Sequence, residues 1–181
     1  MLKLLQEKQL YAKSPKCFFG VQEVEYLGHI VSHEGVKVDP NKIKAIKESK
    51  VPTTIKQLRG FLELTGYYRK FVNNYGRIAA PLTTLLKKDA FSWNPDATKA
   101  FEHIKEAMCL APVLATPNFT KTFIVECDAS GNGIGVVLMQ EGIPIAFESH
   151  PIKGNYLQKA IYEKEMLAIL HVLNKRDDTS R

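Results

Sequence analysis

Three short apolar runs separated by turn residues constrain the fold of this chain most strongly. The runs cover residues 122–128, 134–139 and 143–147, and each is bounded by residues that favour turns. Glu141-Gly142 suits a tight hairpin connection, and Ser130-Gly-Asn-Gly133 supplies the turn before it. The sequence therefore predicts three antiparallel strands here, followed by a helix over residues 161–172.

The first of these runs ends on a carboxylate, Asp128. Because side chains alternate along a strand, Asp128 shares a face with Ile124 and Glu126. An aspartate at the end of a strand is often a turn residue, and it can also be a ligand of a metal ion. The strand alone leaves both interpretations open.

The predicted helix places a second carboxylate, Glu165, on its apolar side. Counted from Ile161 at about 100° per residue, Glu165 falls at about 40°, between Val172 and Ile169, whereas Glu163 falls at about 200°. A carboxylate among apolar residues needs a cation, a metal or strong hydrogen-bond donors. A Mg²⁺ or Mn²⁺ ion shared with Asp128 would meet that need, and so would an arginine partner or a helix-end position.

The middle of the chain is predicted to be helical and basic. Helix starts are indicated at Asp39-Pro40, Thr54 and Asn94-Pro95, with shorter helical pieces over residues 67–72 and 77–86. Residues 53–88 carry Glu63 as their only acid against seven basic residues, namely Lys56, Arg59, Arg69, Lys70, Arg77, Lys87 and Lys88. Aromatic residues are interleaved with these cations. The pattern is typical of a surface that holds nucleic acid, and equally of a solvated helical face over an aromatic core.

Composition excludes several other classes of protein. The 181 residues are 45% hydrophobic, which is enough for a buried core, and the net charge is +6. Cys17, Cys109 and Cys127 are far apart and lack metal-site spacing, so neither disulfides nor structural zinc are indicated. We find no signal peptide and no membrane-spanning run, and we expect an intracellular protein of the cytoplasm or nucleus.

The order of many motifs along residues 4–173 closely resembles the reverse transcriptase and ribonuclease H region of gypsy-type LTR-retrotransposon polyproteins. The most specific are Tyr26-Leu-Gly-His-Ile-Val-Ser32, Gln57-Leu-Arg-Gly-Phe-Leu62 and Leu64-Thr-Gly-Tyr-Tyr-Arg-Lys-Phe71. Others include Asp128-Ala-Ser130, Gly135-Val-Val-Leu-Met-Gln140 and Tyr162-Glu-Lys-Glu165.

The resemblance implies a mixed α/β (α+β) architecture in three parts. Residues 1–38, with short strands at 17–19, 24–31 and 36–38, would be the end of the palm, with a primer-grip-like hairpin at Tyr26, Gly28 and His29. Residues 39–115 would be a helical thumb and connection that hold an RNA/DNA hybrid or a template-primer duplex. Residues 116–181 would begin a ribonuclease H-like domain, in which Asp128 and Glu165 are catalytic and bind Mg²⁺ or Mn²⁺.

The departures from the family pattern matter too. The polymerase's Tyr-x-Asp-Asp element and two further ribonuclease H aspartates are absent, and Asp177-Asp178 stands in a polar tail. We therefore expect the metal site to be incomplete and the chain to be inactive alone. Glu63, Cys127 and Val136 also differ from the residues usual in the family.

Two hypotheses compete with that of an inactive reverse transcriptase and ribonuclease H fragment. One is a non-catalytic module that binds nucleic acid. The other is a structural fragment that associates with a partner through its unfinished sheet.

Overall fold

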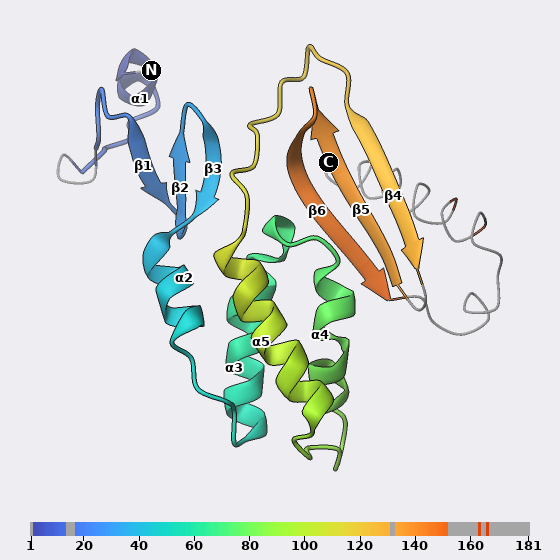
Figure 1. The fold of residues 1–181 in the computed structure, drawn as a ribbon. Helices are drawn as coiled ribbons and strands as arrows, with labels where there is room; N and C mark the ends of the chain where they lie inside the picture. The colour runs from blue at the N-terminus through green and yellow to red at the C-terminus, as the bar shows by residue number, and fades with distance from the viewer. Residues whose placement is uncertain (1, 14–16, 131–132, 152–162, 164–165, 167–181) are drawn as a thin grey trace.

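The structure is a computed structural model that describes residues 2–13, 17–130, 133–151, 163 and 166. A block of helices carries one small sheet at its end and a second sheet along its side (Figure 1). The helices are α1 (Leu2–Glu7), α2 (Pro40–Lys47), α3 (Ile55–Tyr67), the 3₁₀ turn η2 (Arg69–Phe71), α4 (Tyr75–Thr84) and α5 (Pro95–Cys109). The strands are β1 (Glu23–Tyr26), β2 (His29–Ser32), β3 (Gly35–Val38), β4 (Ile124–Ser130), β5 (Gly133–Gln140) and β6 (Ile143–Pro151).

The three predicted helix starts are confirmed, each with its cap. The Asp39 side chain accepts a hydrogen bond from the Asn41 amide at 2.8 Å. Thr54 accepts one from the Gln57 amide at 3.2 Å, and the Gln57 side chain accepts one from the Thr53 amide at 2.8 Å. Asn94 caps α5 in the same way. These caps satisfy amide groups that no helix can satisfy internally, so short local signals determine where the helices begin.

The helical piece predicted over residues 67–72 is wrong in detail. The chain forms only the 3₁₀ turn η2, then becomes extended at Val72 and left-handed at Asn74, where φ is 56°. Phe71 and Val72 are both buried. Two adjacent residues point about 100° apart on a helix, and the tight turn followed by an extended residue instead directs both side chains into the core.

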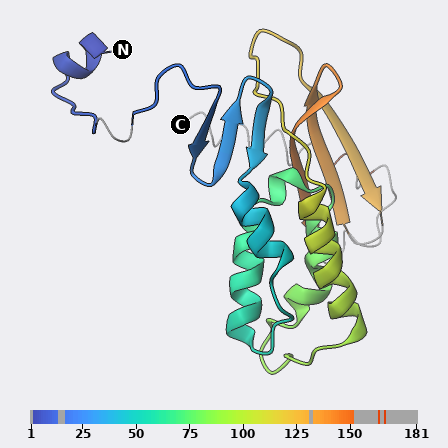
Figure 2. The same cartoon turned by 60° about the vertical axis from the view of Figure 1, so that its left-hand side comes forward.

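The core lies where α2, α3, α4 and α5 meet (Figure 2). Its fully buried members come from each of these helices and include Ile46, Leu58, Leu82, Phe101 and Ile104. The rings of Phe61 and Phe101 lie 4.5 Å apart between α3 and α5. Because each such side chain contributes about 1.5–3 kcal/mol on burial, this cluster supplies most of the stability of the helical block.

The first sheet, here called sheet A, is an antiparallel β1-β2-β3 arrangement. Leu27 and Gly28 connect β1 to β2 with φ angles of 50° and 73°, which is the mirror-image turn that matches the twist of a hairpin. The strand predicted over residues 17–19 does not form. Phe18 and Phe19 are exposed there.

The second sheet, sheet B, confirms the predicted antiparallel meander β4-β5-β6. Asp128 pairs with Gly135 on β5, and Gly135 pairs with Ser149 on β6. Glu141 and Gly142 form the second turn with positive φ, as the sequence predicts. The first turn, at residues 131–132, and the helix predicted over 161–172, including Glu165, lie outside the described residues.

The segment between α5 and β4 connects the two sheets. Leu114 exchanges two backbone hydrogen bonds of 2.8 Å with Val36 on β3. The next residue, Ala115, donates its amide to the Pro144 carbonyl on β6 at 2.8 Å. Two consecutive residues therefore tie sheet A to sheet B. Within the part of the chain that the structure describes, no helix is long and apolar enough to cross a membrane.

Candidate nucleic-acid interface and carboxylate site

The turn of the first hairpin is held against the helical block by two tyrosines. The Tyr67 hydroxyl donates to the Leu27 carbonyl at 2.9 Å, and the Tyr68 hydroxyl donates to the Gly28 carbonyl at 3.1 Å. Burial raises the pKa of Tyr68, and the neighbouring Tyr67, Asp39 and Glu25 raise it further. The Tyr68 hydroxyl therefore stays protonated and able to donate. The turn that the family resemblance predicts to contact a primer therefore has a fixed position at the C-terminal end of α3.

His29 lies beneath this turn, not on its surface. The residue is 8% exposed, and its ring lies 5.4–5.6 Å from the rings of Tyr67, Tyr68 and Phe71. Its Nδ1 is 2.9 Å from the Leu27 carbonyl, whereas the buried Nε2 has no hydrogen-bond partner among the described residues. Burial lowers the pKa of His29, and the charge of Lys70 lowers it further. His29 therefore supports the turn as a neutral ring.

The other residues predicted at the turn divide between surface and support. Tyr26 is 65% exposed and is available to a ligand. Gly28 leaves room for Tyr68, because a β-carbon there would lie 2.6 Å from the Tyr68 hydroxyl. Lys70 lies on the surface with its ammonium 5.3 Å from the centre of the Phe71 ring, and partial desolvation lowers its pKa.

The seven basic residues of the helical block are all exposed, whereas the interleaved Phe61, Tyr68, Phe71 and Tyr75 are buried. The sequence left open whether the aromatic residues form the core or the binding surface. These four residues belong to the core. Arg69 and Lys87 line one groove together, between α3, α4 and β6, which also includes Tyr75 and Ser149. The structure thus brings together two cations that are far apart in sequence.

Asp128 lies on the face of sheet B that is turned toward α4. A β-carbon on its partner Gly135 would overlap the Asn74 side-chain oxygen, and Ser149 on the same row accepts a hydrogen bond from the Gly76 amide at 2.6 Å. Directly paired residues point to the same side of an antiparallel sheet. The Asp128 carboxylate is therefore exposed on the same side as the start of α4.

The donor chemistry of Asp128 fits a hard divalent ion, because Mg²⁺ and Mn²⁺ prefer carboxylate oxygen. Among the residues whose placement is described, no three metal-binding side chains cluster. Glu165, the second predicted ligand, falls in the segment without a described structure. The metal site therefore stays a prediction, and Asp128 is the one of its two predicted ligands that the structure describes.

Sequence patterns missed several residues near this face. Asn73 and Asn74 precede α4, and Lys99 and His103 lie one turn apart on the exposed side of α5. The signal for Asn74 was available, because asparagine is enriched in the left-handed conformation that this residue adopts. Nothing in the local pattern indicates that α5 lies beside α4.

Residues 93–179 match the family described as the RNase H-like domain found in reverse transcriptase. The chain belongs to the family of retrotransposon Pol polyproteins and corresponds to their reverse transcriptase and ribonuclease H region. The Pol polyprotein of transposon gypsy is a member of this family.

Two relatives from Drosophila melanogaster illustrate the match. The chain is 42% identical over 168 residues to the Retrovirus-related Pol polyprotein from transposon 297, covering 92% of this chain and 16% of that protein. It is 37% identical over 188 residues to the Pol polyprotein from transposon gypsy, covering 97% of this chain and 18% of that protein. The chain thus spans less than a fifth of either relative.

A solved structure shows the same fold. The foamy viral protease-reverse transcriptase in complex with an RNA/DNA hybrid is 26% identical in sequence, with a TM-score of 0.78. The similarity covers 87% of this chain and 22% of that one.

Proposed function

We propose that this chain holds an RNA/DNA hybrid or a template-primer duplex on its helical block, and that Asp128 serves RNA-strand cleavage. The docked hairpin turn is the observation that carries the proposal. Its surface presents the exposed Tyr26, and the exposed Lys70 lies close enough to His29 beneath the turn to lower its pKa. An exposed aromatic ring and an exposed cation suit a nucleic-acid backbone, because the cation pairs with phosphate and the ring contacts sugar or base.

The similar foamy viral structure supports this proposal because it contains an RNA/DNA hybrid. The exposed cations of the helical block would supply sequence-independent affinity. Asp128, with Glu165, would hold Mg²⁺ or Mn²⁺, which supplies an activated water when bound. We also infer an intracellular setting, as the composition predicts.

Hybrid binding tests the first part. Fluorescence anisotropy with a labelled RNA/DNA hybrid should show an affinity that falls as salt rises. Replacing Lys56, Arg59, Arg69 and Lys70 with glutamine should weaken binding roughly 100-fold or more and flatten the salt slope by about four phosphate contacts. Binding that ignores salt, or that survives this variant, would contradict the proposal.

Cleavage tests the second part. The assay uses a longer chain that cleaves the RNA strand with Mg²⁺ or Mn²⁺. In that chain, the Asp128→Asn substitution should abolish cleavage. Asn is close to Asp in size, so hybrid binding should persist in the variant and exclude misfolding. Cleavage by this chain alone would overturn the expectation of an incomplete metal site.

We propose association through β4 as a second possibility. Within the described residues, β4 pairs only with β5, and Ile124 and Val125 beside this edge are partly exposed. Sedimentation should then show concentration-dependent mass, whereas a monomer at every concentration would remove this candidate.

A further inference from the structure

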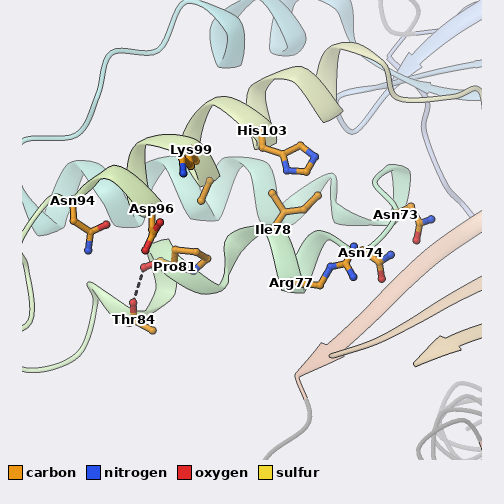
Figure 3. Close-up of a pocket in the computed structure, with 11 residues that line it drawn as sticks. Asn73, Asn74, Arg77, Ile78, Pro81, Thr84, Asn94, Asp96, Lys99 and His103 are labelled. Atoms are coloured by element: carbon orange, nitrogen blue, oxygen red, sulfur yellow. Dashed lines mark hydrogen bonds between the residues drawn. The ribbon is translucent and has the colours of Figure 1, made fainter. Parts of the chain in front are cut away.

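A groove of about 640 Å³ runs between α4 and α5 (Figure 3). Its polar lining includes Asn73 and Arg77 from the start of α4, and Lys99 and His103 from α5. The side chains of Lys99 and His103 lie one helical turn apart, so they form a row along the groove. Lys99 and His103 lie outside the basic stretch that the sequence pattern identified.

Charge is distributed unevenly along this groove. At one end lie Asp96, the acidic residue in the first turn of α5, and Asn94, the N-cap of this helix, beside Thr84 at the end of α4. Arg77 and His103 lie toward the opposite end, where the groove approaches the strands of sheet B (Figure 3). Lys99 lies between these two ends, one turn after Asp96, and the lining residues nearest the sheet include no acid.

The same end of the groove meets the strand next to Asp128. Asn74 lies against Gly135, and the Arg77 β-carbon lies 3.9 Å from where a β-carbon on Gly133 would stand. Gly135 is the register partner of Asp128, about 4.5–5.5 Å away between α-carbons. Asp128 therefore lies one strand further out on the face that the groove approaches.

The groove on the other side of α4 does not have this relation to Asp128. That groove includes Arg69 and Lys87, but it reaches sheet B at Ser149 on β6. Strand β6 is the edge opposite β4 in the order β4-β5-β6. Of these two grooves, only the one between α4 and α5 leads toward the strand that carries Asp128.

We infer that the groove between α4 and α5 binds the sugar-phosphate backbone of the hybrid and directs it toward Asp128. This inference rests on the proposed function and adds a path to it. Arg77 and Lys99 would pair with phosphates, because charge-assisted hydrogen bonds to phosphate are the strong ones. The Asn73 amide and the His103 ring would add further hydrogen bonds. Asp96 would keep phosphate from the far end by like-charge repulsion.

The test compares two double variants that remove the same charge. Arg77→Gln with Lys99→Gln changes the groove, whereas Lys44→Gln with Lys47→Gln changes exposed lysines on α2 that do not line it. In hybrid-binding titrations, the groove variant should lose about tenfold or more in affinity. The slope of log affinity against log salt concentration should fall by the amount expected for about two phosphate contacts. The α2 variant should lose much less. Circular dichroism checks that both remain folded.

Photo-crosslinking supplies a second, local readout. A photoreactive amino acid at position 99 should crosslink to the hybrid, and the same residue at position 44 should not. If the wild-type chain binds hybrid but the groove variant matches the α2 variant and position 99 does not crosslink, the groove inference is overturned and the proposed function stands. If the wild-type chain binds no hybrid, the proposed function itself fails.

Discussion

Sheet A and sheet B have the same topology but are attached to the helical block in different ways. Both are three-stranded antiparallel meanders. Sheet A is held at its turn by hydroxyl groups of Tyr67 and Tyr68 that reach backbone carbonyls. Sheet B lies so close to the start of α4 that Gly135 faces Asn74 with no room for a β-carbon.

Sheet A is attached at its turn by tyrosine hydroxyl groups, whereas sheet B combines one hydrogen bond, from the Gly76 amide to Ser149, with close backbone approach at Gly135. Hydrogen bonds from tyrosine fix the turn at Leu27 and Gly28 at a set distance, because each hydroxyl must meet one carbonyl oxygen. Close backbone approach fixes sheet B against sliding, because any side chain at Gly135 meets Asn74. The residues that would contact nucleic acid are thus placed by one mechanism and Asp128 by the other.

Gly35→Ala should have the largest effect, because it removes the bridge between the sheets. Gly35 has a φ of 132°, which is essentially restricted to glycine, and a β-carbon would overlap the Leu114 carbonyl oxygen. Strain and the lost hydrogen bonds to Leu114 should lower the free energy of unfolding by about 3 kcal/mol or more, measured by urea denaturation. Gly142→Ala is the matched control, because its φ is also positive but its surroundings are open. Equal losses in the two variants would show that the bridge contributes nothing.

Gly135→Ala tests attachment by shape. A β-carbon there would overlap the Asn74 side chain, so the variant should be destabilised by about 1–2 kcal/mol. Asn74→Gly in the same chain should restore most of this loss, since glycine tolerates the left-handed φ of 56°. Gly133→Ala meets only ordinary contacts and serves as the control. Thermal denaturation in which Asn74→Gly fails to restore stability would argue against this contact.

Tyr68→Phe tests attachment by hydrogen bonds. The lost hydroxyl bond to Gly28 should cost about 0.5–1.5 kcal/mol, because Gly28 retains an acceptor bond from the Asp39 amide at 3.2 Å. Tyr67→Phe removes the equivalent bond at an exposed site and should cost less. Hydrogen exchange should show faster opening of β1 and β2 in Tyr68→Phe and unchanged protection in sheet B. Uniform acceleration in both sheets would contradict separate attachment.

His29 should give the smallest effect, seen as a pH dependence. Its pKa in the folded chain is below the ordinary 6.5, so the unfolded chain binds more protons. The His29 contribution to stability is therefore complete above about pH 6.5 and is lost as pH falls toward the lower folded pKa. The slope of unfolding free energy between about pH 7.5 and 5.5 should shrink in His29→Gln and persist in the control His33→Gln. An unchanged slope in His29→Gln would show that the buried ring does not titrate in this way.

Local signals account for the parts of the fold that the sequence predicts well. Asp39, Thr54 and Asn94 cap the helices they precede, because a cap depends on residues two or three positions away. The Glu141-Gly142 turn and the alternation around Asp128 are likewise local. The 3₁₀ turn η2, in place of a helix over residues 67–72, was not predicted, because burial of Phe71 and Val72 overrides helical spacing.

The sequence by itself determined the family, the helix starts, the meander and the presence of Asp128 on its first strand, although that strand continues past Asp128 to Ser130. The tertiary structure decided that His29 is enclosed, that Asn74 meets Gly135, and that Arg77 and Lys99 line one groove. These contacts join residues that are distant along the chain. A periodic pattern shows which face of an element is apolar but not which other element covers it, so packing alone could place them.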